Sequence, residues 1–179
     1  AAARQMPGAL VRCAENSEAF VNTVRLTVPQ EAELSKIAVH YLHNAAFAAD
    51  KTAGVGMCTS GGFNVLGNDG RCSMIGREIG FENIGVAADI DTSTHGNEAS
   101  LDSIVEKDPD YIFVMDRDAA IGIDGAQLAQ EIMENELVMG TDAHTNGHHV
   151  YLAHPAAWYH AEGGIPALAL MRMHMESSL

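Results

Sequence analysis

The segment at residues 108–118 constrains the fold more than any other part of the chain. Five consecutive apolar residues, 111–115 (YIFVM), lie between two short acidic stretches, DPD and DRD. An apolar run of this length with polar residues at both ends is typical of a strand that is buried on both faces of a sheet. Helical spacing precedes the run at 100–105 and follows it at 126–133. This order predicts a parallel sheet with helices on both faces.

The rest of the chain repeats this alternation of strands and helices. Short apolar runs bounded by turn residues predict three further strands, at 53–58, 63–66 and 150–153. Apolar side chains at three- and four-residue steps predict a long helix at 30–50 and a short one at 73–79, and a final helix is expected from Pro166. We therefore expect an α/β fold: a single three-layer lobe with a mostly parallel sheet.

Three segments are expected along the chain: an unassigned N-terminal segment at 1–30, a long connecting helix at 31–50 and the lobe at 51–179. The chain has 179 residues, of which 47% are hydrophobic, and this is enough for one domain with a core. No apolar run approaches the roughly 18 residues that cross a bilayer. The start of the chain does not have the charged and then apolar pattern of a signal segment.

Charge and cysteine content exclude two classes of function. The formal net charge is −14 and the chain has three lysines, so clustered contacts to nucleic-acid phosphates are not expected. Cys13, Cys58 and Cys72 are odd in number and have no CxxC spacing. They indicate neither a zinc site nor a disulfide framework, and we expect small buried thiols.

Four polar side chains lie in loops or at element ends, where ligands bind in open α/β sheets. Arg71 follows the GNDG turn, Arg117 directly follows the YIFVM strand, His95 lies in the polar TSTHG loop and Tyr159 follows the last strand. Each has an ordinary alternative: a solvated arginine, an arginine paired with a neighbouring aspartate, an exposed histidine or an aromatic side chain packed on the core.

Together the four side chains suit one kind of ligand. Fe(III) prefers oxygen ligands, so the phenolate of Tyr159 suits it, and the imidazole of His95 is acceptable. Ferric catecholate complexes are anionic, and arginines are natural counter-ions for such oxygens. A tyrosine and a histidine on neighbouring loops would fill the coordination positions of the iron that its chelator leaves open.

Four segments, in this order, carry a family resemblance: GGFNVLGNDGR, STHGNEASLDSIVEKDPDYIFVMDRDAAIG, NELV and VYLAHPAAWYHAEGG. They resemble the C-terminal lobe of the periplasmic-type siderophore-binding proteins of bacterial ABC importers, in particular the catecholate-type group. The DPDYIFVMDR block is the most specific part, and the WY pair before two glycines is next. The resemblance extends from about residue 55 to residue 171.

The resemblance implies capture of iron as Fe(III) in a siderophore complex and its delivery to the permease of an ABC importer, with no enzymatic activity. Arg71 and Arg117 match the family's ligand-binding arginines, and His95 and Tyr159 match its iron-coordinating residues. The implied location is extracytoplasmic, either the periplasm or, through a lipid anchor, the cell surface. The long helix is similar to the family's helix between two lobes.

One departure from the family affects the expected binding. The family places a whole N-terminal lobe before the long helix, whereas about thirty residues precede it here. A single lobe offers half of the binding cleft, so we expect weaker binding. Its exposed cleft face would also favour self-association.

Two other functions compete with ferric-siderophore binding. The first is a lobe-only interaction module that dimerises and transports nothing. The second is a metal-dependent hydrolase that uses His95, Glu98 and the HTNGHH loop with His144, His148 and His149. No nucleophile motif such as GxSxG supports the hydrolase, and we interpret the histidine loop as a solvated loop.

Overall fold

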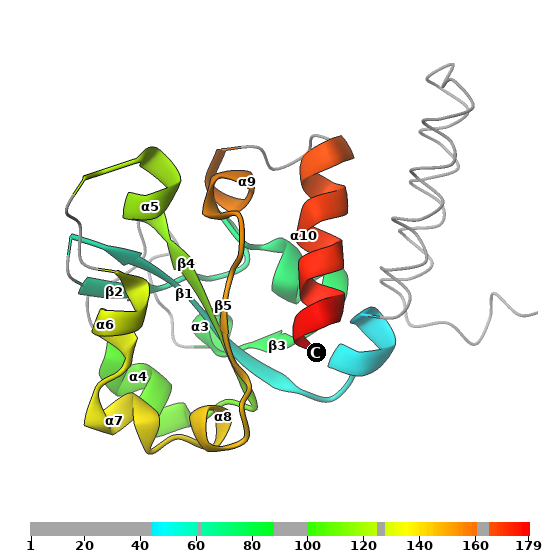
Figure 1. Cartoon of the computed structure of the whole chain (residues 1–179). Helices are drawn as coiled ribbons and strands as arrows, with labels where there is room; N and C mark the ends of the chain where they lie inside the picture. Colours follow the sequence, from blue (N-terminus) through cyan, green and yellow to red (C-terminus); the bar gives the residue numbers. More distant parts are fainter. Residues whose placement is uncertain (1–43, 61, 88–99, 125–127, 161–164) are drawn as a thin grey trace, which may run out of the picture.

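The computed structural model describes residues 44–60, 62–87, 100–124, 128–160 and 165–179. These residues form a twisted sheet with helices on both faces (Figure 1). Its strands are β1 (Thr52–Thr59), β2 (Gly62–Val65), β3 (Glu82–Asn83), β4 (Tyr111–Asp116) and β5 (His149–Tyr151). The strand order is β2-β1-β4-β5, with β3 beside β1. Only β2 runs antiparallel among these pairs, so the expected mostly parallel sheet is confirmed.

Nine helical segments follow or separate the strands in the described part of the chain. They are η2 (Ile75–Ile79), α3 (Ile84–Ala87), α4 (Ser100–Lys107), α5 (Arg117–Ile121), α6 (Ala129–Met133), α7 (Glu136–Met139), α8 (Asp142–Thr145), α9 (Pro155–His160) and α10 (Ile165–Ser178). Residues 44–48, also helical, precede β1. Of the predicted helix at 30–50 the structure describes residues 44–50, in which 44–48 are helical and 49–50 form a turn. None of the described helices is long and apolar enough to span a membrane.

The core has two parts because successive side chains of a strand point to opposite faces of the sheet. On one face, Phe113 and its neighbours on β1 and β4 pack against η2, α9 and α10. On the other face, Ile112 and Val114 pack against α3, α4, α6, α7 and α8. β4 has buried side chains on both faces, from Tyr111 to Met115, as expected for a central strand.

Most predicted elements are found in place, with two corrections. The helix expected at 73–79 is a short π-helix, η2, which ends at Gly80 with a positive φ of 103°. The last strand is shorter than the predicted 150–153, since β5 ends at Tyr151. The chain turns away from the sheet after Leu152, whose amide still donates to Val114 O at 2.8 Å. Cys58 and Cys72 are buried, as predicted, and Cys13 lies outside the described residues.

A glycine in β1 lets α4 approach the sheet closely. A Cβ atom on Gly54 would lie 2.2 Å from Ile104 Cδ1 and 3.3 Å from Pro109 Cγ. We therefore expect Gly54→Val to lower the free energy of unfolding by about 1–3 kcal/mol through overpacking. The control is Gly62→Val in β2, because a Cβ there would meet only Thr59 O, at 3.7 Å. Chemical unfolding of both variants tests this, and equal losses would contradict the packing explanation.

Candidate ligand-binding site

Three of the predicted site residues lie at the carboxyl edge of the sheet. Because β1, β4 and β5 are parallel, they end at the same edge, at Thr59, Asp116 and Tyr151. Helices α5 and α9 start beyond this edge and contact one another (Figure 1). Arg117 is the first residue of α5, and Tyr159 lies in α9.

Arg117 is placed by the end of β4 and the start of α5. The Asp116 side chain caps α5 by accepting a hydrogen bond from Ala119 N at 2.8 Å. Arg117 Nη1 donates to Thr59 Oγ1 at 3.1 Å and to Asp118 Oδ1 at 3.0 Å. The ion pair considered for Arg117 therefore exists, and Asp118 is its partner.

Arg71 and Tyr159 meet although 88 residues separate them in the sequence. Arg71 Nε donates to the Tyr159 carbonyl oxygen at 3.2 Å. The guanidinium carbon of Arg71 also lies 4.0 Å from the centroid of the Tyr159 ring, a distance typical of a cation–π contact. Arg117 contacts the same tyrosine, and a hydrogen bond to the Tyr159 side chain is the main reason why the pKa of Arg117 is raised, with Asp118 adding to it.

The structure thus joins Arg71, Arg117 and Tyr159 in one cluster, the arginine–tyrosine cluster. Tyr159 is partly buried and packs against the core, and part of its surface remains exposed to solvent. His95, the second predicted iron ligand, lies outside the described residues. The cluster places two cations around one phenol, an arrangement that suits an anionic iron complex.

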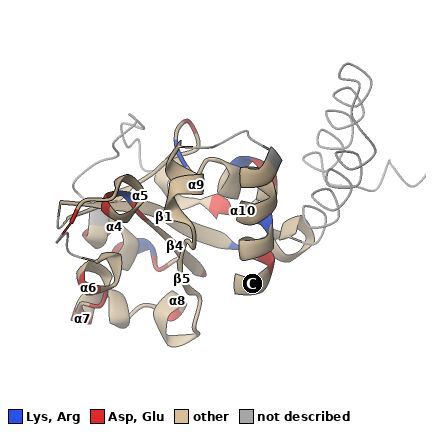
Figure 2. Cartoon of the chain, turned by 45° about the horizontal axis from the view of Figure 1, so that its top comes forward, with Lys and Arg blue, Asp and Glu red and all other residues tan. Residues whose placement is uncertain are grey.

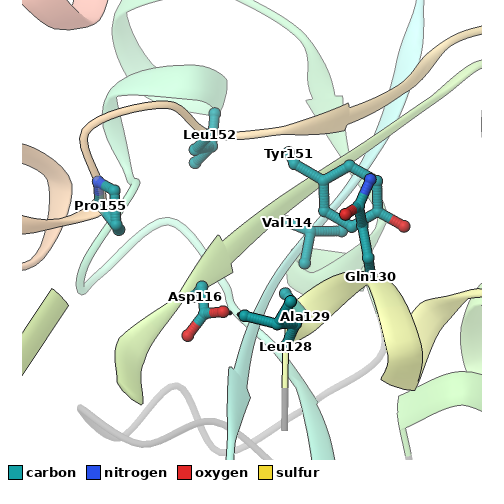
Figure 3. A pocket seen from close by; sticks show the side chains of 8 residues that line it. All are labelled: Val114, Asp116, Leu128, Ala129, Gln130, Tyr151, Leu152 and Pro155. Carbon is teal, nitrogen blue, oxygen red and sulfur yellow. Dashed lines mark hydrogen bonds between the residues drawn. The ribbon is translucent and has the colours of Figure 1, made fainter. Parts of the chain in front are cut away.

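A pocket that the sequence did not predict lies beside this cluster. It has a volume of about 290 Å³ and opens between α6 and the ends of β4 and β5 (Figure 3). Its lining is mostly apolar and consists of Val114, Asp116, Leu128, Ala129, Gln130, Tyr151, Leu152 and Pro155. Asp116 holds α6 there, since its Oδ2 accepts from Ala129 N at 3.1 Å. The pocket is separate from the arginine–tyrosine cluster, because none of Arg71, Arg117 and Tyr159 lines it. We place the candidate site at the cluster because its two cations suit an anionic ligand.

The histidine-rich loop does not form a recognisable metal centre. His144 Nδ1 and His149 Nδ1 are 3.5 Å apart, whereas His148 stacks on Tyr111 with ring centroids at 4.2 Å. Within the described ranges, no group of three or more histidine, cysteine, aspartate or glutamate side chains is placed to hold a metal ion. The loop therefore offers no support for a hydrolase.

His149 makes the stability of the fold sensitive to pH. Burial, with a smaller effect of His144, lowers the pKa of His149 to about 4 from an ordinary 6.5. The folded state then binds this proton less readily than the unfolded chain. The stabilisation is complete above pH 6.5 and is lost as the pH falls towards 4. We expect a loss of about 1–2 kcal/mol between pH 7 and pH 5 from this residue.

His149→Phe should remove this part of the pH dependence and keep an aromatic ring against Tyr151. Urea unfolding at pH 7 and pH 5 measures the difference for each protein. His160→Gln, at an exposed position on α9, is the control and should behave as the unmodified chain does. An unchanged pH dependence in His149→Phe would contradict the role of His149.

Comparison with known proteins shows to which family the chain belongs. Residues 21–157 match the profile of the family described as periplasmic binding protein. The chain belongs to this family. Members of the periplasmic binding protein family are binding proteins rather than enzymes, so the expected absence of enzymatic activity agrees with this membership.

Individual members of the periplasmic binding protein family resemble the chain over part of their length. Petrobactin-binding protein YclQ of Bacillus subtilis is 34% identical over 125 residues, which are 66% of this chain and 38% of YclQ. The solved structure of the iron uptake ABC transporter substrate-binding protein PiuA from Streptococcus pneumoniae superposes with a TM-score of 0.74 and 29% identity, over 83% of this chain and 52% of PiuA.

A third relative gives the same result. The periplasmic catecholate-siderophore binding protein VctP from Vibrio cholerae superposes with a TM-score of 0.72 and 28% identity, over 82% of this chain and 52% of VctP. The chain thus spans about half the length of these solved relatives, and its α/β fold corresponds to one lobe of theirs.

Proposed function

We propose that this lobe binds a ferric siderophore of the catecholate type at the arginine–tyrosine cluster. As part of the whole protein, which would act outside the cytoplasm, the lobe would deliver the complex to the permease of an ABC importer. The observation that carries the proposal is the contact of two guanidinium groups with one tyrosine at the carboxyl edge of the sheet. The names of YclQ, PiuA and VctP, which refer to siderophores or iron uptake, support the same class of ligand.

Each residue of the cluster has a separate role in this proposal. Arg71 and Arg117 bind the anionic catecholate oxygens, and a guanidinium group suits them because it stays charged and offers several N–H donors. Tyr159 supplies a phenolate oxygen to the iron, and His95 supplies an imidazole nitrogen. A tetradentate siderophore leaves two of six iron positions for these two side chains. A hexadentate siderophore leaves none, so it would depend on the arginines alone.

Titration calorimetry with a ferric bis-catecholate tests the proposal. We expect saturable binding of the ferric complex and at least tenfold weaker binding of the iron-free chelator, which lacks the metal for Tyr159. The double variant Arg71→Gln, Arg117→Gln should weaken binding of the ferric complex strongly, since it removes both cations. Binding that is unchanged in the double variant would place the ligand elsewhere and refute the proposed site.

A further inference from the structure

Asp118 is the most deeply buried charged group that the structure describes at the carboxyl edge of the sheet. Only 5% of its surface is exposed. Its Oδ2 accepts a hydrogen bond from Ser60 N at 2.8 Å. Its Oδ1 accepts from Arg117 Nη1 at 3.0 Å and from Thr59 Oγ1 at 3.5 Å. These partners are all donors, as an ionised carboxylate requires when it is buried.

The position of Asp118 changes the charge that a ligand meets. Arg117 has 26% of its side chain exposed and Asp118 has 7%, so the cation faces the solvent and the anion lies behind it. A ligand that binds Arg117 therefore also experiences the fixed negative charge of Asp118, which lies behind the guanidinium group. Asp118 therefore offsets much of the positive charge that Arg117 would otherwise present to a ligand.

Among the described residues, the surroundings of the cluster do not restore this positive charge. The chain as a whole has a formal net charge of −14. Figure 2 shows acidic residues on α6, α7 and α8 and also at α5, where Asp116 and Asp118 lie. A highly charged anion therefore gains little electrostatic binding energy at this site, and an anion of low charge binds at little disadvantage.

We propose that Asp118 limits the preference of this site for highly charged ferric complexes, so that complexes of low charge bind with affinities similar to those of trianionic ones. This inference rests on the proposed function, because it concerns the same arginine–tyrosine cluster. It makes Asp118 a specificity-determining residue that acts through Arg117. A purely structural role would predict that loss of Asp118 weakens all ligands alike, whereas the charge role predicts a change that depends on the ligand's charge.

The test uses three ferric probes built on the same tripodal hexadentate scaffold. They carry three catecholates, two catecholates and one hydroxamate, or three hydroxamates, with charges of −3, −2 and 0. All three saturate the iron, so coordination by Tyr159 does not enter the comparison. Dissociation constants are measured for the unmodified chain, for Asp118→Asn and for Glu106→Gln. The last variant removes one exposed carboxylate from α4 and serves as the charge-matched control.

We expect the unmodified chain to bind the three probes with affinities within about tenfold of one another. In Asp118→Asn the −3 probe should gain about tenfold relative to the neutral probe. This is the shift expected when a unit charge is removed at roughly 8 Å from three charges in water. Glu106→Gln should leave the ratio within about twofold of its original value, because of distance and screening.

The outcomes separate this inference from the proposed function. If the unmodified chain binds none of the probes and no bis-catecholate, the proposed function fails. If it binds them and the ratio in Asp118→Asn stays within twofold, the inference about Asp118 is wrong. If Asp118→Asn does not fold, the measurements on the unmodified chain still test the inference. A preference of more than a hundredfold for the −3 probe over the neutral probe would overturn it.

Discussion

Replacing Tyr159 by phenylalanine should weaken binding of a tetradentate ferric bis-catecholate by about 100-fold. Removal of groups that merely support a metal ligand costs about 10- to 100-fold in affinity, so loss of a ligand itself belongs at the upper end. The same change should weaken a hexadentate complex by less than about threefold, because its iron has no open position. Phenylalanine keeps the ring under the Arg71 guanidinium, so the variant removes the phenol oxygen and its hydrogen bond to Arg117.

Tyr151→Phe is the matched control for this comparison. Tyr151 lies in β5, and its hydroxyl is buried without a hydrogen-bond partner in the structure. The control should bind both classes of complex as the unmodified chain does. Dissociation constants from calorimetry or fluorescence give the comparison. Equal losses for tetradentate and hexadentate complexes in Tyr159→Phe would refute iron coordination by Tyr159.

Replacing Phe113 by alanine should have the largest effect on stability. Phe113 is fully buried in the central strand, and its ring contacts Phe81 at a centroid distance of 5.2 Å and Tyr111 at 5.8 Å. Removal of a buried phenylalanine leaves a cavity and lowers the free energy of unfolding by about 3–5 kcal/mol. Most domains have a free energy of unfolding of about 5–15 kcal/mol, so a loss of this size would remove a large part of the stability.

Leu137→Ala provides the comparison on a surface position. Leu137 lies in α7 and is 58% exposed, so its truncation should cost less than about 1 kcal/mol. Chemical unfolding followed by circular dichroism measures both variants. A loss below 1 kcal/mol for Phe113→Ala would contradict the assignment of β4 as the central buried strand.

The sequence predicted the parts of the fold that rest on long apolar runs. The strands at 53–58 and 111–115 each have a continuous apolar run, and both are confirmed with shifts of one residue. The end of α4 before Pro109 and the Gly80 end of η2 are also confirmed, because capping and proline signals are local. Domain limits near residues 30 and 50 stay predictions.

The short helices were missed because they have no room for a periodic pattern. Helices α5, α7 and α8 have four or five residues each, less than two turns. Their ends depend on side-chain caps, such as Asn135, which accepts from two amides at the start of α7. Such caps look like ordinary polar loop residues in a sequence.

The site shows the same limit. Arg71, Arg117 and Tyr159 were predicted from their positions at element ends, and their mutual contacts follow from the parallel order of the strands. The Asp118 side chain accepts a hydrogen bond from the backbone amide of Ser60, which is 58 residues away, and the sequence does not show this contact. The DRD motif was the signal that could have suggested it.

Quenching of Trp158 fluorescence by a ferric bis-catecholate tests the central claim most directly. Trp158 is the single tryptophan of the chain, is fully buried and directly precedes Tyr159. Binding at the arginine–tyrosine cluster would bring the coloured iron complex close to its indole ring. We predict saturable quenching by the ferric complex that is strongly weakened in Arg71→Gln, Arg117→Gln. A folded chain that shows no saturable quenching with several ferric catecholates would contradict the proposed function.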